Sequence, residues 1–201
     1  MLSQVVFNQV NSFAAKCSKH FTNEEIQIFD SLLQPRSVKK KTFLLQEGEI
    51  CNFEAYVVKG CIRTYYIDEN GFEVILQFAI EDWWVSDIAS FNEQTPSKLF
   101  IETLEDCELL TFNPETKEEL LTRAPKFERM FRLMLQRNLA STQNRLINTI
   151  SKTAQEKYLD FIEKYPTIPQ RVPQHYIASY LGISPEFLSK VRTKLSRQKQ
   201  Y

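Results

Sequence analysis

The amino-acid sequence predicts an α+β chain, in which an N-terminal β-roll is followed by a long helix and then by a pair of short helices. Three observations lead to this prediction. Short runs of β-branched and aromatic residues recur between residues 37 and 112, a helical period without glycine follows from about residue 125, and a glycine-centred motif lies near the C-terminus. We expect three parts, which span residues 1–124, 125–151 and 152–201.

The composition is that of an ordinary soluble globular protein, with 201 residues of which 43% are hydrophobic and 25% are charged. The N-terminus carries no secretory leader pattern, and no window of about 18 apolar residues occurs in the sequence. We therefore expect a cytoplasmic protein without a membrane partner.

Charge is distributed unevenly along the chain. Residues 1–125 hold 11 basic and 20 acidic residues, whereas residues 126–201 hold 14 basic and 5 acidic residues. A basic block favours an anionic partner such as nucleic acid, because each neutralised phosphate releases counterions. The alternative is a basic helix face that is simply solvated.

The sequence contains no catalytic or metal-binding constellation. The four cysteines, Cys17, Cys51, Cys61 and Cys107, lie far apart without a Cys-x-x-Cys pair, and the chain has only two histidines. We expect reduced, partly buried thiols rather than zinc or iron–sulfur ligands. Gly-x-Ser-x-Gly, His-Glu-x-x-His and a phosphate loop are also absent from the sequence, so we expect neither catalytic residues nor a bound cofactor.

The β-roll follows a predicted N-terminal helix. Thr22 precedes Glu25 by three residues, which is the spacing of a capping box, and Pro35 closes the helix that this box opens. Six strands are then predicted at residues 42–45, 55–58, 62–67, 74–79, 100–104 and 108–112. Three of the chain's four glycines lie in this block, at positions where a hairpin needs a positive φ.

A helical period runs from about residue 125 to residue 165 and carries an apolar stripe. The stripe consists of Phe127, Met130, Phe131, Met134, Leu135, Leu139, Thr142 and Leu146, and continues to Thr149 and Ile150. It can pack on the chain's own β-domain or on a symmetry mate, and we expect it to form a dimer helix. Pro166, Pro169 and Pro173 then indicate a linker.

Residues 173–195 have the pattern of a helix-turn-helix. Gly182 supplies the left-handed conformation of a tight turn, Ser184 is a predicted N-cap, and Pro185 suits the first helical position. The residues predicted to face inward are Ile177, Ala178, Leu181, Leu188, Val191 and Leu195.

The outward face of this motif has the composition of a helix that lies in the major groove of DNA. The predicted DNA-binding residues are Gln174, Ser184, Pro185, Glu186, Ser189, Lys190, Thr193, Lys194 and Arg197. The alternative is an ordinary helical hairpin with a solvated basic face.

This order of parts resembles the catabolite-activator/FNR (Crp/Fnr) family of bacterial transcription regulators. The resemblance covers residues 21–197 and includes LLQEGE at 44–49, YVVKG at 56–60 and GISPE at 182–186. It implies a cyclic-nucleotide-binding-like jelly roll with flanking helices, a long dimerisation helix and a helix-turn-helix. A homodimer that binds double-stranded DNA at a palindromic operator is then expected. The resemblance also admits an unidentified small-molecule effector and RNA polymerase as partners.

The chain departs from the family in its ligand clamp. In members that bind cyclic nucleotides, a Gly-Glu pair contacts the ribose and an arginine pairs with the phosphate. The corresponding residues here are Ser86, Asp87 and Ser97, and a serine cannot replace a guanidinium fork. We therefore expect that cAMP does not bind well. The residues predicted to line the effector pocket are Ser86, Asp87, Ile88, Ala89, Ser97, Lys98, Ser141 and Thr142.

Two further departures concern the family's cysteine cluster and its DNA-binding end. Only Cys17 stands near the N-terminus, where FNR-like members carry several cysteines. The sequence stops at Tyr201, before the family's β-hairpin wing, and Gln174 and Pro185 replace frequent arginines. We expect a helix-turn-helix that lacks a full wing and has its own base preference. The alternative function is a small-ligand-binding β-roll with a helical tail and no sequence-specific DNA binding.

Overall fold

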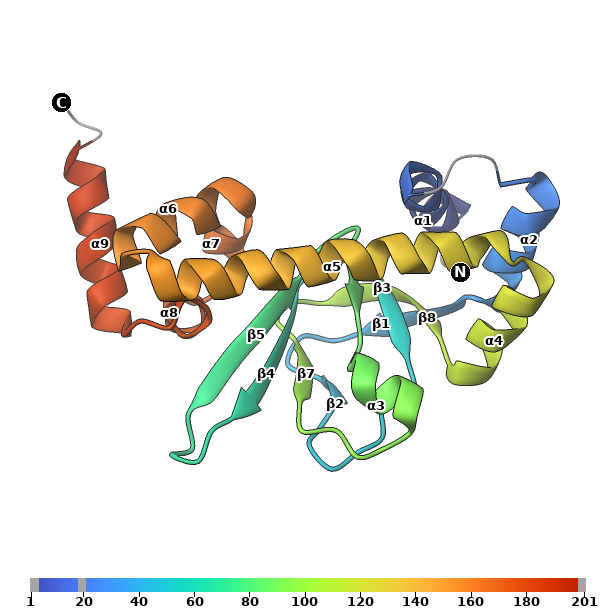
Figure 1. The fold of residues 1–201 in the computed structure, drawn as a ribbon, viewed down its shortest axis with the longest axis horizontal. Helices are drawn as coiled ribbons and strands as arrows, with labels where there is room; N and C mark the ends of the chain where they lie inside the picture. The colour runs from blue at the N-terminus through green and yellow to red at the C-terminus, as the bar shows by residue number, and fades with distance from the viewer. Residues whose placement is uncertain (1–3, 18–20, 199–201) are drawn as a thin grey trace. The chain divides into compact units, whose positions relative to one another are not determined.

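The structure is a computed structural model that describes residues 4–17 and 21–198 (Figure 1). The chain divides into two compact units. The first unit comprises Met1–Tyr66 and Phe78–Arg137, and the second comprises Ile67–Gln77 and Asn138–Tyr201. The second unit thus includes a segment, residues 67–77, that lies within the predicted β-roll.

Two four-stranded antiparallel sheets form the β-roll. One sheet has the order β1 (Gln34–Val38), β8 (Cys107–Phe112), β3 (Glu54–Lys59) and β6 (Trp84–Val85). The other has the order β2 (Phe43–Leu45), β7 (Phe100–Thr103), β4 (Ile62–Ile67) and β5 (Glu73–Ala79). Val57, Ile62, Ile101 and Leu109 are fully buried in the core of the roll.

A second core of the first unit joins helices to one sheet. It is built by α1 (Gln4–Cys17), α2 (Asn23–Leu32), α4 (Pro114–Arg123) and the first half of α5 (Lys126–Ser151), together with residues of β3 and β8. Phe29 of α2 stacks on Phe127 of α5, with ring centroids 4.5 Å apart. The predicted capping box is confirmed, because Thr22 Oγ1 accepts from the Glu25 N–H and Glu25 accepts from the Thr22 N–H.

The six predicted strands are present, but β1, β6, α1 and the short helix α3 (Ile88–Glu93) were not predicted. Pro35 does not merely close α2, since it lies inside β1, opposite Leu110. A proline is tolerated there because β1 is the edge strand of its sheet, where one side of the backbone needs no ladder partner.

The predicted helical period also breaks earlier than residue 165. Helix α5 ends at Ser151, and α6 (Ala154–Lys164) begins with a capping box of Thr153 and Glu156. This box satisfies the first amides of a new helix, so the backbone turns without a glycine or proline. The predicted linker likewise contains a short helix, α7 (Ile168–Arg171), with a proline in its first turn.

The second unit packs α6 and α7 against α8 (Gln174–Leu181) and α9 (Pro185–Gln198). Its buried apolar residues include Tyr158, Phe161, Ile168, Ile177 and Leu188. The ring centroids of Phe161 and Tyr180 are 5.4 Å apart. The helix pair that carries the predicted motif is therefore supported by its own core.

Arg145 joins three elements of the second unit. Its Nη1 donates to the carbonyl of Leu76, and its Nη2 donates to the carbonyls of Ile75 at 3.0 Å and Tyr180 at 2.9 Å. The guanidinium also lies 4.0 Å from the centroid of the Tyr180 ring. Burial lowers the pKa of Arg145. A guanidinium suits this position because its fixed fork reaches several acceptors at once.

Ser179 adds a second connection between β5 and α8. Its hydroxyl accepts from the Ile75 N–H at 3.0 Å and donates to the Glu73 carbonyl at 2.7 Å. The backbone of residues 73–76 is thus hydrogen-bonded to side chains of α5 and α8 over this stretch.

Gly60 lies where the backbone leaves no room for a side chain. Its φ is +110°, and a Cβ atom placed there would lie 2.5 Å from Cys107 Sγ and 2.9 Å from the Asp106 carbonyl oxygen. Gly48 also has a positive φ, of +87°, but nothing lies within 4 Å of the Cβ position. A side chain at Gly48 would therefore meet backbone strain alone, whereas a side chain at Gly60 would meet both backbone strain and a steric clash.

We predict that Gly60→Ala destabilises the first unit by about 3 kcal/mol, whereas Gly48→Ala costs about 1 kcal/mol, because only the first adds a steric clash to the backbone strain. Urea denaturation followed by the fluorescence of Trp83 and Trp84 measures both. If Gly60→Ala and Gly48→Ala lower the free energy of unfolding equally, the close approach of Cys107 to Gly60 does not contribute to the cost of the substitution.

Candidate nucleic-acid interface and effector site

The turn between α8 and α9 is built as the sequence predicted. Gly182 has a φ of +65° and its N–H donates to the carbonyl of Ser179 at 3.1 Å. Ser184 then caps α9, because its Oγ accepts from the Phe187 N–H at 3.2 Å. Leu188 and Val191 of α9 are buried, which fixes the face that α9 presents to solvent.

The predicted DNA-binding residues whose side chains the structure describes are all exposed. They are Gln174 at the start of α8, Ser184 in the turn, and Pro185, Glu186, Ser189, Lys190, Thr193 and Lys194 on α9. The predicted Arg197 lies in α9, and its side chain is outside the described residues. The described side chains place two lysines and one glutamate on the solvent face of α9.

Glu186 interacts with the first turn of its own helix. A hydrogen bond from its own backbone N–H, a second from the Ser184 hydroxyl, and the charge of Lys190 lower the pKa of Glu186. Lys190 follows Glu186 by four residues, a spacing at which opposite charges attract on a helix. The hydroxyl of Thr193 donates to the Ser189 carbonyl at 3.0 Å.

One exposed residue of α9 was missed by the sequence reasoning. Phe187 is 49% exposed, although it lies between Glu186 and the buried Leu188. The sequence signal was ambiguous, since Phe187 precedes Val191 by four residues and therefore lies at the margin of the apolar face that Leu188, Val191 and Leu195 form.

At the predicted ligand clamp of the β-roll, Asp87 forms hydrogen bonds within its own chain. Its Oδ1 accepts from the N–H groups of Ala89 and Ser90, and so caps α3. Its Oδ2 accepts from the Ser97 hydroxyl at 2.7 Å. Both side chains are buried. The two predicted clamp residues Asp87 and Ser97 are thus joined to each other.

The neighbouring serine hydroxyl groups also form hydrogen bonds within the chain. Ser86 donates to the Phe53 carbonyl at 2.9 Å, and Ser90 donates to the Thr95 carbonyl at 2.6 Å while it accepts from the Cys51 N–H. Lys98 is exposed next to the buried Ser97, and it lies at a bend before β7 rather than on a strand.

The remaining predicted effector-pocket residues belong to different units of the chain. Ile88 and Ala89 are exposed in the first turn of α3. Ser141 and Thr142 belong to the second unit, where Ser141 accepts from Lys164 and Thr142 donates to the Asn138 carbonyl.

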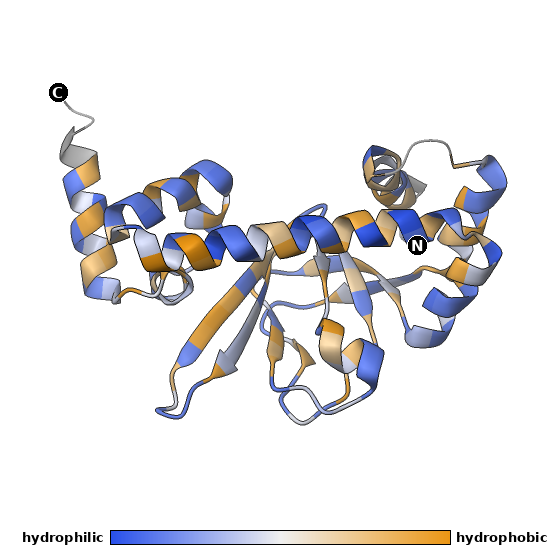
Figure 2. Cartoon of the chain, in the orientation of Figure 1, coloured by the Kyte–Doolittle hydropathy of each residue, from blue (hydrophilic) through white to orange (hydrophobic). Residues whose placement is uncertain are grey.

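The predicted dimer stripe needs a correction in its first half. Phe127, Met130 and Phe131 are buried in the helical core of the first unit, and Met134 packs against that core, so these residues face their own chain. Helix α5 alternates between hydrophobic and hydrophilic residues (Figure 2). Its large exposed apolar residues are Leu135 (51%), Leu139 (61%), Leu146 (60%), Ile147 (58%) and Ile150 (79%).

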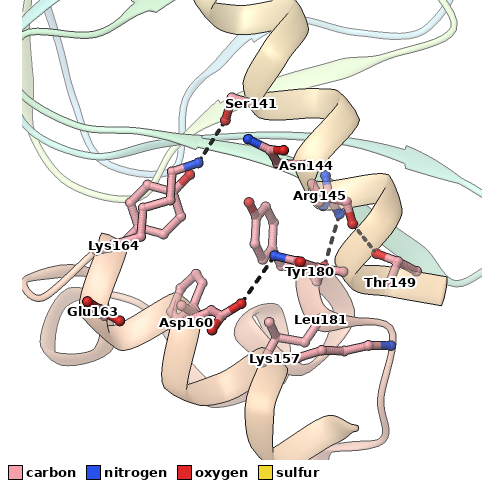
Figure 3. Close-up of a pocket in the computed structure, with 13 residues that line it drawn as sticks. Ser141, Asn144, Arg145, Thr149, Lys157, Asp160, Glu163, Lys164, Tyr180 and Leu181 are labelled. Carbon is pink, nitrogen blue, oxygen red and sulfur yellow. Dashed lines mark hydrogen bonds between the residues drawn. The ribbon is translucent and has the colours of Figure 1, made fainter. Parts of the chain in front are cut away.

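A pocket of about 510 Å³ lies between α5, α6 and α8 (Figure 3). Its polar lining is largely paired internally. Lys164 donates to Ser141 at 2.7 Å, Asp160 accepts from Asn148 and Lys152, and Arg145 is bound to backbone carbonyls. Burial raises the pKa of Tyr180 to about 12, so this lining tyrosine is neutral near pH 7.

Cys17, Cys51, Cys61 and Cys107 are free and buried. Within residues 4–17 and 21–198, no group of three His, Cys, Asp or Glu side chains is placed to hold a metal ion. Among the helices of these residues, none has the length and apolar character needed to cross a bilayer.

The cyclic nucleotide-binding domain family matches residues 35–124. The transcriptional activator protein Anr of Pseudomonas protegens is 23% identical over 187 residues, which cover 87% of this chain and 75% of that protein. The anaerobic regulatory protein of Pasteurella multocida is 23% identical over 199 residues, which cover 92% of this chain and 72% of that protein.

Two solved structures share the fold. The global regulator CLP of Xanthomonas campestris has a TM-score of 0.72 at 18% identity, and the likeness covers 89% of this chain and 93% of that one. The catabolite activator protein of Thermus thermophilus has a TM-score of 0.56 at 20% identity, with 90% and 86% covered. In its β-roll, the long helix α5 and the α8–α9 motif, the chain is similar to regulators of the Crp/Fnr family.

Proposed function

We propose that the protein is a homodimeric DNA-binding transcription regulator, in which α9 enters the major groove. The observation that carries this proposal is the α8–Gly182–α9 motif, whose capped second helix exposes its predicted base-reading residues. Two relatives, of which the matched stretch covers 75% and 76%, are transcriptional activators. The excess of basic over acidic residues in residues 126–201 supports an anionic partner.

The dimer is proposed to form through the exposed apolar face of α5. Leu135, Leu139, Leu146 and Ile150 are separated by steps of four and seven residues, so they share one side of the helix. Burial of this stripe against a second copy would remove apolar surface from water. A two-fold dimer would present two copies of α9, which favours a palindromic operator with half-sites about 34 Å apart.

The β-roll is proposed to respond to an effector other than cAMP. A cyclic phosphate needs a cation in a partly desolvated site, whereas the clamp positions here hold a carboxylate and a serine that bind each other. An anionic ligand would have to break the Asp87–Ser97 hydrogen bond and approach the Asp87 carboxylate.

The first prediction from the proposed function concerns the dimer. A double variant, Leu139→Asp with Leu146→Asp, is expected to sediment as a monomer at micromolar concentration, because two charges would be buried at the seam. Asn144→Asp adds a charge on the opposite side of α5 and should leave the dimer intact. A wild-type monomer that binds single half-sites would contradict the proposed dimer.

The second prediction separates base reading from phosphate contact. Glu186→Ala should relax the preference at one position of each half-site by about 1–3 kcal/mol, because a carboxylate accepts a hydrogen bond from cytosine N4. Lys194→Ala should weaken binding to all sequences and reduce the salt dependence by about one charge.

In vitro selection of DNA and salt-dependent binding measure these two effects, and Lys41→Ala in the first unit is the control for loss of a lysine. If the selected sequence is unchanged in Glu186→Ala, then Glu186 only stabilises the helix N-terminus. If wild type selects no sequence, the function is instead that of a ligand-binding β-roll with a helical tail.

The third prediction concerns cAMP. Loss of a bidentate charge-assisted contact should weaken binding by about 3 kcal/mol, or about a hundredfold, relative to a clamp that contains arginine. Calorimetry should therefore detect no cAMP binding at micromolar concentration, with a cAMP-binding member of the family as the positive control. A dissociation constant in the micromolar range or tighter would contradict the closed clamp.

A further inference from the structure

Phe187 is an isolated exposed aromatic residue in the first turn of α9. Its backbone N–H is held by the Ser184 cap at 3.2 Å, so the position of its Cα atom is fixed by the turn. The ring remains 49% exposed, whereas Leu188 and Val191 of the same helix are buried. Burial of the apolar face of α9 therefore does not explain why a phenylalanine stands at this position.

The surroundings of Phe187 are polar. Glu186 precedes it, Lys190 lies one turn further along the helix, and Lys194 lies two turns along, all exposed. An apolar partner protein would require a contiguous patch of several hundred Å². A single ring between hydrogen-bonding side chains instead fits a surface on which one apolar group stands among donors and acceptors.

The edge of an A·T pair in the major groove is such a surface, because the thymine 5-methyl group lies beside the O4 acceptor and the adenine N6 and N7 groups. We propose that Phe187 contacts a thymine methyl group in each half-site and so determines specificity at that base pair. This inference rests on the proposed function. A phenylalanine suits the contact because its two side-chain torsions lose little entropy on binding.

The test begins with selection of DNA by the wild-type protein, followed by replacement of each selected thymine with deoxyuridine, which removes only the methyl group. At one thymine per half-site, deoxyuridine should weaken wild-type binding about fourfold, the value of one buried methyl group. Phe187→Ala should bind the thymine and deoxyuridine sites equally, and Phe187→Leu should keep part of the difference.

Leu159→Ala is the matched control, because Leu159 is an exposed apolar residue of α6 in the same unit. This variant should keep the full fourfold difference, and far-UV circular dichroism checks that each variant is folded. The inference is overturned if Phe187→Ala keeps the wild-type difference at every thymine, or if the selected half-site contains no thymine. If wild type selects no sequence at all, the proposed function fails first and the inference fails with it.

Discussion

The surface proposed to bind DNA depends on one buried cation. Arg145 of α5 gathers carbonyl oxygens from β5 and from the last turn of α8, and its guanidinium stacks on Tyr180. These acceptors are the groups that a strand edge and a helix C-terminus leave without partners. One side chain therefore pairs with the edge of β5 and with the last turn of α8. Because only three residues separate α8 from α9, the contact also constrains the orientation of α9.

The β-roll shows how a binding position can become a structural one. Asp87 is a predicted pocket residue, and its two carboxylate oxygens cap α3 and accept a hydrogen bond from Ser97. A buried carboxylate needs such partners, because an unsatisfied charge in the interior is costly. Ser97 supplies one of these partners, because its hydroxyl donates to Asp87 Oδ2.

Features that depend on local chemistry were predictable from the sequence. Gly182, Ser184 and Pro185 specify a left-handed turn, a cap and a first helical residue within four positions, and the structure contains all three. The capping box of Thr153 and Glu156 is an equally local signal for the start of α6. The sequence prediction did not use it, because the helical period continues through these residues. Long-range partners carried no such signal. Nothing near Arg145 in sequence indicates that it binds residues about 70 positions away.

The apolar stripe of α5 illustrates a different limit. A helical period identifies an apolar face but does not identify what covers it. Here the first half of the stripe is covered by the chain's own aromatic residues, since Phe127 stacks on Phe21 and Phe29. The second half is left open to solvent. Only the positions of α1, α2 and α4 distinguish these cases, and those positions result from packing across the whole first unit.

The assignment of residues 67–77 to the second unit has a consequence for recombination within the family. A chimaera that exchanges everything after α5 for the corresponding part of a relative would separate Ser179 from the hairpin backbone that it binds, and Tyr180 from Arg145. The inherited module is therefore discontinuous in sequence. A functional exchange would have to carry the hairpin and Arg145 together with the helices, so insertions and deletions in this hairpin should be inherited together with changes in α8.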